Sequence, residues 1–398
     1  MRLQALRIPP CVRGTHQELP ATQTFDLWIE GGHVVEIVPS DEAARGTLVS
    51  AFVDAHVHLD KTHTVAQAGA AHGPLASAIE RSAANRQTWT APDLRRRMAL
   101  ALEDAYACGT RAMRTHLDWV SDDMPVALRV FEHLREQWRG RVELQVVALA
   151  PLDLWADPGA AQRIAGQLAV TAAGGTAALG AFVYRNDDAR RKLERLFDLA
   201  KRHNLGLDFH VDEGLDADAT GLRDIAELAL SLGFEGRIVC GHACSLSVQP
   251  AQEAEQTLRA CLRAGVRLVA LPTTNLYLQG SWDGTPLERG ITRLKEAVAV
   301  GMQPSVASDN VADPFYPYGS YDLLETFGLA VQLAHLAPAE EWLASITVNP
   351  ARALGLPWDG LITEGCPADL LYLSARNEHE LLTPAGRRRS VMRRGQFL

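Results

Sequence analysis

Short apolar runs, rich in β-branched residues, alternate along most of this chain with longer stretches in which apolar residues recur at helical spacing. The short runs predict strands at residues 48–57, 111–118, 142–150, 179–183, 206–211, 237–242, 267–272 and 303–309. The longer stretches predict helices between the strands, among others at residues 92–107, 126–138, 187–203, 218–232 and 250–264. This alternation is typical of α/β proteins and favours a closed parallel (β/α)8 TIM-like barrel.

An open, doubly wound sheet is the alternative architecture for such an alternation. It would require a glycine-rich phosphate-binding turn directly after the first strand. The segment AFVDAHVHLD, at residues 51–60, contains no glycine. The sequence therefore favours the closed barrel.

Both ends of the chain have a different pattern, with short alternating runs and turn residues but no long helical stretch. The segments DLWIEGGHVVEIV, ADLLYLS and SVMRRGQFL are examples. We predict that residues 1–48 and 356–398 form one small β-sandwich domain, because each end alone has too few strands to be stable. Residues 49–355 then form the barrel domain.

Composition and charge narrow the functional classes. The chain has 398 residues, of which 47% are hydrophobic and 22% charged, as in soluble globular proteins. It contains neither a long unbroken apolar segment nor a typical signal peptide, so we expect a cytoplasmic protein that does not bind membranes. Its 39 Lys and Arg residues against 48 Asp and Glu residues give a net charge of −9, which disfavours nucleic acid as a partner.

Imidazoles and a carboxylate stand at the carboxyl ends of four predicted strands. His56 and His58 end the first strand, two residues apart, so their side chains face the same side. His210 ends the fifth strand, His242 the sixth and Asp309 the eighth. Active sites of such barrels lie at this end of the strands, so these residues predict a catalytic site.

Three imidazoles and one carboxylate fit a divalent metal such as zinc or iron, whereas harder cations would require more carboxylates. A single histidine at a strand end is more often a structural residue. Its recurrence on several strands of one barrel favours a metal site.

Longer segments extend this pattern to a known family. FVDAHVHLDKTHT, DFHVDEG, GHACSLS and ASDNVADPFYPYGSYDLLE resemble the amidohydrolase superfamily, in its branch of cytosine deaminase-like enzymes and triazine amine hydrolases. The resemblance extends over almost the whole chain, up to the segment PADLLYL. It implies one divalent metal ion, zinc or iron, with the ligands His56, His58, His210 and Asp309.

The resemblance also implies catalytic roles. Glu213 would act as the proton shuttle, and His242 would orient the attacking hydroxide and stabilise the developing negative charge. Asp309 would act as the general base. The reaction would replace an amino group of a heterocycle by an oxo group and release ammonia.

The substrate-binding positions depart from the cytosine deaminase pattern. Leu152 and Asp153 stand where those enzymes have a glutamine that binds the pyrimidine edge, unless a shifted loop lets Asp153 or Gln145 replace it. Asn310 replaces a second aspartate, and Phe315 replaces a tryptophan. Because one lost polar contact can change specificity by orders of magnitude, we expect isocytosine, a substituted pyrimidine or an aminotriazine rather than cytosine.

We therefore predict a deaminase of a small nitrogen heterocycle. An enzyme of the same branch that releases an alkylamine from a triazine, or that opens a cyclic amide, is one alternative. A non-catalytic binding protein is another, and the complete set of catalytic residues disfavours it. Homo-oligomers are common among barrels of this kind, which is an analogy of fold, and the sequence does not indicate the oligomeric state of this chain.

Overall fold

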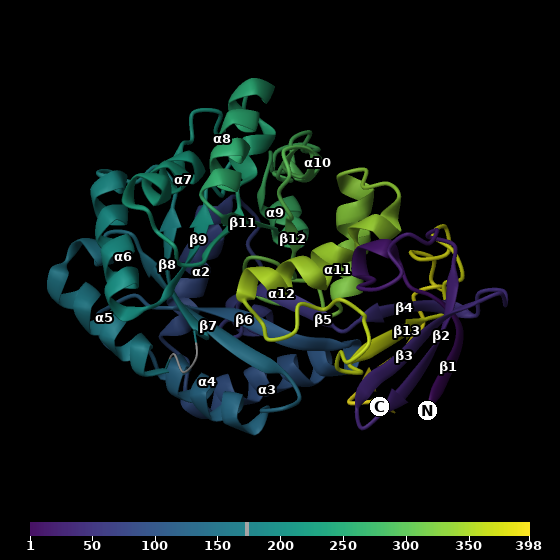
Figure 1. Ribbon diagram of the computed structural model, residues 1–398. Coiled ribbons are helices and arrows are strands. Elements are labelled where there is room, and N and C mark those ends of the chain that lie inside the picture. The colour runs from purple at the N-terminus through teal and green to yellow at the C-terminus, as the bar shows by residue number, and fades with distance from the viewer. Residues whose placement is uncertain (172–174) are drawn as a thin grey trace.

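Eight parallel strands surrounded by helices form the larger part of the computed structural model, which describes residues 1–171 and 175–398 (Figure 1). The predicted (β/α)8 barrel is confirmed. In sheet order its strands are β12 (Ser305–Val306), β11 (Val266–Ala270), β10 (Ile238–His242), β9 (Gly206–Val211), β8 (Ala177–Val183), β7 (Glu143–Pro151), β6 (Thr110–Asp118) and β5 (Phe52–Val57).

The barrel closes where the first and last strands meet. Val57 forms a parallel bridge with Asp309, and the Asp309 backbone N–H donates to the carbonyl of His56 at 2.9 Å. The backbone N–H of Ser308 donates to Oδ1 of Asp54 at 3.1 Å. Closure therefore places Asp309 directly beside the strand that carries His56.

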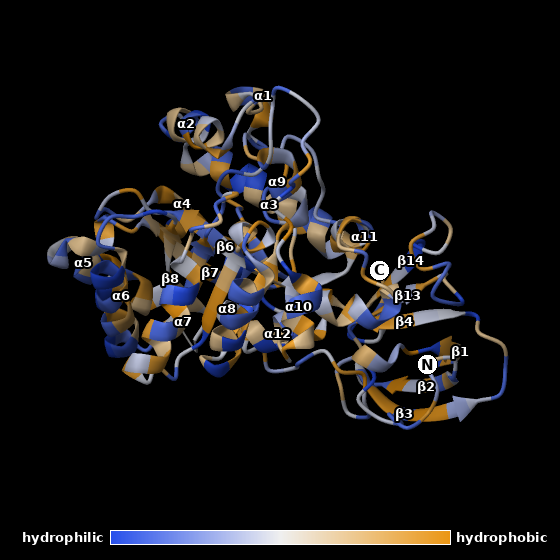
Figure 2. Cartoon of the chain, turned by 90° about the horizontal axis from the view of Figure 1, so that it is seen from above, coloured by the Kyte–Doolittle hydropathy of each residue, from blue (hydrophilic) through white to orange (hydrophobic). Residues whose placement is uncertain are grey.

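Amphipathic helices cover the outside of the barrel. In Figure 2 the strands β7 and β8 are largely hydrophobic, whereas the outer side of α6 is hydrophilic. The buried residues of α6 are Leu193, Leu196, Phe197, Leu199 and Ala200, which recur at helical spacing. The helices are α1 (Val65–Ala68), α2 (Leu75–Arg86), α3 (Ala91–Cys108), α4 (Val126–Gln137), α5 (Pro158–Thr171), α6 (Ala189–His203), α7 (Gly221–Leu232), α8 (Ala251–Arg263), α9 (Pro272–Leu278), α10 (Leu294–Ala299), α11 (Leu323–Leu333) and α12 (Val348–Leu354).

Strands from both ends of the chain form a second sheet, in which the two termini lie near each other (Figure 1). Strand β4 pairs antiparallel with β13, which joins the amino-terminal strands to the carboxyl-terminal ones. In sheet order the strands are β15 (Gln396–Phe397), β14 (Arg389–Arg393), β13 (Leu370–Leu373), β4 (Gly46–Ser50), β1 (Arg2–Arg7), β2 (Thr24–Glu30) and β3 (His33–Ser40).

The run predicted as one strand at residues 48–57 is two strands, because it changes partners at Ala51. The Ala51 N–H donates to the carbonyl of Asp369 in the carboxyl-terminal segment, at 2.9 Å. The next N–H, of Phe52, donates to the carbonyl of Gly109 at 3.0 Å, directly before β6. The predicted boundary at residue 48 therefore falls within β4, and the division into domains at 1–48, 49–355 and 356–398 stays a prediction.

Two other strands are shorter than predicted. The run at 267–272 ends as a strand at Ala270, since Pro272 begins helix α9. The run at 303–309 pairs as a strand only over β12, and Asp309 contributes a single bridge.

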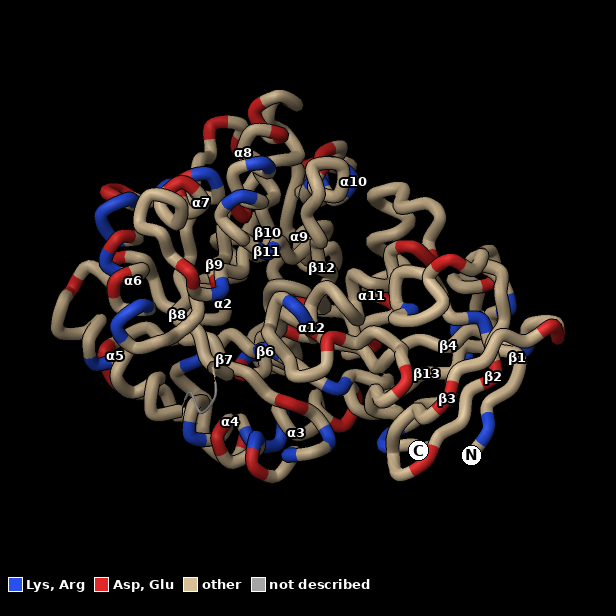
Figure 3. The backbone as a smooth tube through the Cα atoms, viewed as in Figure 1, with Lys and Arg blue, Asp and Glu red and all other residues tan. Residues whose placement is uncertain are grey.

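Charged residues of both signs are interspersed along the outer helices (Figure 3). Among the described residues, no helix combines the length and the apolar character that crossing a membrane requires.

Candidate metal and catalytic site

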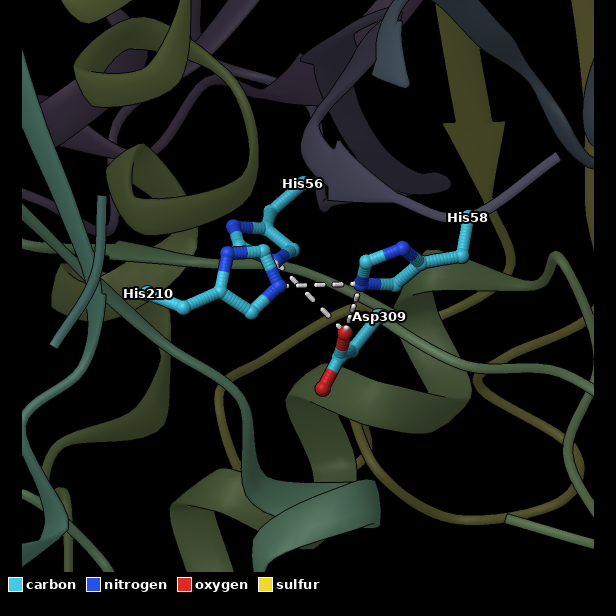
Figure 4. Close-up of side chains that lie close together, drawn as sticks. All are labelled: His56, His58, His210 and Asp309. Atoms are coloured by element: carbon cyan, nitrogen blue, oxygen red, sulfur yellow. Dashed lines mark hydrogen bonds and ion pairs between the residues drawn. The ribbon is translucent and has the colours of Figure 1, made fainter. Parts of the chain in front are cut away.

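Three imidazoles and one carboxylate converge at the carboxyl end of the barrel (Figure 4). Nε2 of His210 lies 3.2 Å from Nε2 of His56 and 3.1 Å from Nε2 of His58. Oδ1 of Asp309 lies 3.2 Å from Nε2 of His58 and 3.6 Å from Nε2 of His56. All four side chains are buried. These short distances show that the structure brings the four predicted metal ligands together.

These four residues fit a divalent metal ion. Ligands about 2.0–2.1 Å from a tetrahedral zinc ion lie roughly 3.3–3.4 Å from one another, close to the separations observed. Among the described residues, both carboxylate oxygens of Asp309 are buried without a hydrogen-bond partner, and a buried carboxylate is stable only when paired or metal-bound. Burial also lowers the pKa of His56 and His210 well below the usual range, which keeps both imidazoles neutral, as metal ligands must be.

Two of the predicted site residues have left-handed backbone conformations. Asp309 has φ = 60° and His242 has φ = 68°. Such conformations cost non-glycine residues on the order of 1–3 kcal/mol and cluster at functional sites. Here they place both side chains at the end of the barrel where the other candidate ligands meet.

Glu213 and His242 form a pair beside the four candidate metal ligands. Nδ1 of His242 lies 3.4 Å from Oε1 of Glu213 and 3.0 Å from Nδ2 of Asn275. Burial, together with the charge of Asp309, raises the pKa of Glu213 well above its ordinary value. This shift favours the protonated carboxyl group, the form that a proton donor requires. Nε2 of His242 is buried and has no hydrogen-bond partner in the described part of the chain, residues 1–171 and 175–398.

A cavity of about 390 Å³ opens next to these groups, with a largely apolar wall. Its lining includes His58, His210, Glu213 and His242 together with every residue predicted to bind substrate: Leu152, Asp153, Asn310 and Phe315. The structure therefore places Glu213, His242 and the four predicted substrate-binding residues around one cavity, whereas Asp309 is not among its lining residues.

Leu152 and Asp153 differ in exposure at this wall. Leu152 is buried, whereas the Asp153 side chain is 79% exposed and forms an ion pair with Nζ of Lys192 at 2.5 Å. Gln145, the alternative source of an amide, does not line the cavity. Its Oε1 accepts hydrogen bonds from Arg114, and its Nε2 donates to the carbonyl of Leu354. The interpretation in which Gln145 replaces the missing glutamine is therefore wrong.

Asp313 fixes the loop that carries Asn310 and Phe315. Nδ2 of Asn310 donates to Oδ2 of Asp313 at 2.6 Å. Oδ1 of the same carboxylate accepts from the backbone N–H groups of Phe315 at 2.8 Å and Tyr316 at 3.1 Å. The orientation of the Asn310 amide is thus set before any ligand binds.

The sequence analysis missed several residues around the site. His116 in β6 stacks on His56, with ring centroids 3.8 Å apart. Asp118 at the end of β6 accepts a hydrogen bond from Nζ of Lys61 at 2.8 Å. The segment RTHLD, at residues 114–118, carries the same signal that identified His56 and His210, an imidazole and a carboxylate at a strand end. Nothing in the sequence pattern indicates the role of Asn275.

Comparisons with known proteins agree with this geometry. Residues 135–397 match the model of the amidohydrolase family. The chain is 37% identical to the pterin deaminase of Rhizobium rhizogenes (strain K84 / ATCC BAA-868) over 385 residues, which cover 94% of this chain and 87% of that protein.

Solved structures resemble the whole chain as well. The 5-methylcytosine deaminase of Klebsiella pneumoniae, liganded with phosphonocytosine, superposes with a TM-score of 0.85 and 25% identity, covering 100% of this chain and 98% of that one. The N-isopropylammelide isopropylaminohydrolase of Burkholderia multivorans ATCC 17616 gives a TM-score of 0.78 and 26% identity, with the same coverage of both chains.

Proposed function

This chain belongs to the amidohydrolase family, in its cytosine deaminase-like branch, and we propose that it deaminates a 2-amino-4-oxo heterocycle, with pterin as the leading candidate. The observation that carries the proposal is the position of Glu213 and the converging histidines in the wall of one cavity. The similarity to a pterin deaminase over nearly the whole chain favours the substrate. Pterin contains the 2-amino-4-oxo ring of isocytosine, fused to a second ring.

The shape and chemistry of the cavity support a two-ring substrate. Its volume of about 390 Å³ lies within the usual range of ligand pockets, about 300–1,000 Å³. Leu149, Ala150, Pro151 and Leu152 form an apolar wall, and Phe315 offers an aromatic ring for stacking. Release of an alkylamine and opening of a cyclic amide are the less favoured alternatives. A non-catalytic binding protein is not favoured either, because the family consists of hydrolases.

We propose His56, His58, His210 and Asp309 as the residues that hold one divalent metal ion. When bound, such an ion supplies hydroxide at neutral pH, because it lowers the pKa of water from 15.7 to about 7. Glu213 donates its proton to the ring nitrogen beside the amino-bearing carbon and so makes this carbon more electrophilic.

The remaining groups act on charge and on the leaving amine. If Asn275 donates to Nδ1 of His242, the neutral imidazole carries its proton on Nε2. This N–H has no protein partner and can stabilise negative charge that develops on the substrate. Asp309 accepts the proton of the nucleophile and returns it to the departing amine. Water and the amino heterocycle thus become the oxo heterocycle and ammonia.

Gly241→Ala is expected to weaken metal binding without removing a ligand. A Cβ at Gly241 would lie 2.8 Å from Cε1 and 2.9 Å from Nδ1 of His56, so the ring must move. Changes in groups that support metal ligands typically cost 10–100-fold in metal affinity, and we expect a loss of roughly this size in competition with a chelator. Gly166→Ala is the control, since its Cβ would meet open space. Unchanged metal affinity in Gly241→Ala would contradict the assignment of His56.

Cytosine is expected to be a poor substrate. Leu152 cannot make the hydrogen bonds of an amide, and each polar group left unpaired in a dry pocket costs about 1–3 kcal/mol. At 1.36 kcal/mol per decade, two lost hydrogen bonds lower kcat/KM for cytosine by roughly 10²–10⁴ relative to the preferred ring. The measurement is ammonia release from pterin, isocytosine, cytosine, creatinine and ammelide.

The outcome of this panel tests the proposed function directly. Turnover of pterin or isocytosine well above that of cytosine supports it, and Leu152→Gln should then raise the relative kcat/KM for cytosine. If cytosine were the best of the five substrates, the interpretation of Leu152 would be wrong. No ammonia release from any of them by metal-loaded enzyme would refute the proposal.

Finer properties stay predictions from the sequence. These are the choice between zinc and iron, the cytoplasmic location, a homo-oligomeric state by analogy of fold and the absence of nucleic-acid and membrane partners.

A further inference from the structure

A buried lysine borders the proposed substrate cavity close to the metal ligands. Lys61 follows His58 by three residues, and its side chain is 5% exposed. Its Nζ lies 2.8 Å from Oδ1 of Asp118 and 5.0 Å from the centroid of the Phe315 ring. A cation, its carboxylate partner and an aromatic ring therefore form one continuous part of the cavity wall.

Two cations share the carboxylate of Asp118. Oδ1 binds Lys61, and Oδ2 binds Arg86 of helix α2. The charge of Asp60 also acts on Lys61, while Oδ2 of Asp60 accepts a hydrogen bond from the backbone N–H of Asp118 at 2.8 Å. Asp118 therefore holds the ammonium of Lys61 at this wall through a carboxylate that Arg86 fixes in turn.

Lys61 keeps donors available for a ligand. An ammonium group has three N–H donors, and over residues 1–171 and 175–398 only the hydrogen bond to Asp118 is formed by Nζ. The contact with Phe315 is a cation–π contact and uses no acceptor. A buried cation with free donors at a cavity wall favours a ligand with an acceptor oxygen there.

Two other donors at this cavity, the Asn310 amide and Arg86, are less suited to this role. The Asn310 amide already donates to Asp313, and Leu152 has no donor in its side chain. Arg86 is more exposed than Lys61, at 24%, and lies on helix α2 rather than beside His58.

We infer that Lys61 is a specificity-determining residue that binds the ring carbonyl oxygen of the substrate, in place of the amide that Leu152 lacks. The inference rests on the proposed function, because it assigns to Lys61 the recognition of the ring oxygen of the proposed substrate. A heterocycle without this oxygen would lack the contact. Asp118, which is itself fixed by Arg86, holds the ammonium in position, and Phe315 packs against it.

The test compares the binding of 4-quinazolinone and quinazoline to the metal-loaded enzyme by calorimetry. These two-ring heterocycles differ by the 4-oxo group, and neither has an amino group to lose. A hydrogen bond to a charged group is worth roughly 10–100-fold in affinity, so the wild-type enzyme should prefer 4-quinazolinone by about this factor. Lys61→Met should reduce the preference to less than about threefold, whereas Lys61→Arg, which keeps the cation, should retain part of it.

The preference for 4-quinazolinone over quinazoline is also measured in a matched control variant. Lys192→Met removes another lysine paired with an aspartate at the cavity and should leave the preference unchanged. A wild-type preference retained in Lys61→Met, or equal binding of both rings by the wild-type enzyme, would overturn the inference. Because Asp118 keeps its pair with Arg86, Lys61→Met does not leave this carboxylate without a partner. Ammonia release from pterin by the wild-type enzyme tests the proposed function separately, so the two failures are distinguishable.

Discussion

His210→Ala is expected to abolish ammonia release and to lower the metal content of the purified protein. Nε2 of His210 lies within 3.2 Å of Nε2 of both His56 and His58, so it is central to the candidate ligand set. Its loss leaves two imidazoles and one carboxylate. We expect activity to fall by more than the roughly 10²–10³-fold that loss of one oxyanion-stabilising donor costs, because the source of hydroxide is lost with the metal.

Metal analysis and kcat on the same protein sample check this expectation. His203→Ala is a suitable control, because His203 is an imidazole at the end of helix α6, where it contacts Gln162 at the surface. His203→Ala should retain both metal and turnover. Full metal occupancy with unchanged turnover in His210→Ala would refute the assignment of His210 as a ligand.

The barrel could be predicted because most of its strands are bounded by residues that break the apolar pattern. The strand at 206–211 begins at Gly206 and ends before the polar segment DEG, and β9 has these bounds. The run at 48–57 contains no glycine or proline at the point where it passes from one sheet to the other. Its change from one sheet to the other at Ala51 depends on Asp369 and Gly109, which are distant in sequence, so a local pattern cannot reveal it.

Helix α2 was not predicted, although it forms part of the cavity wall. Its buried residues are Ala78 and Ser82, which give no apolar stripe. The helix contributes Leu75, Ile79 and Arg86 to the cavity. Side chains that face a ligand cavity are not selected for burial against a core, so hydrophobic periodicity is a weak signal for such a helix.

The metal ligands could be predicted because the barrel topology places all strand ends at one face. Identification of His56, His210 and Asp309 required only the position of each residue on its strand. The substrate side depends on which side chains pair with each other. Asp153 forms an exposed ion pair with Lys192, and Lys61 forms a buried one with Asp118. Strand periodicity contains no information on either pair.

Glu213→Gln is expected to keep the metal and to lower kcat by roughly 10²–10⁴, the range for loss of a general acid–base group. Glutamine has nearly the same shape and still donates a hydrogen bond, but it cannot release a proton to the ring. Glu213 is not one of the four converging ligands, so metal content should not change. Glu235→Gln, at an exposed position, is the control and should have wild-type kinetics.

The pH dependence of kcat separates proton donation by Glu213 from a purely structural role. Burial raises the pKa of Glu213 above its ordinary value, so the carboxyl group keeps its proton to a higher pH than an exposed glutamate and loses it as the pH rises further. In the wild-type enzyme kcat should therefore fall on the alkaline side. In Glu213→Gln the residual kcat should lack this alkaline fall, because the amide does not titrate. A near-native rate in this variant, or an unchanged alkaline limb, would mean that another group protonates the ring.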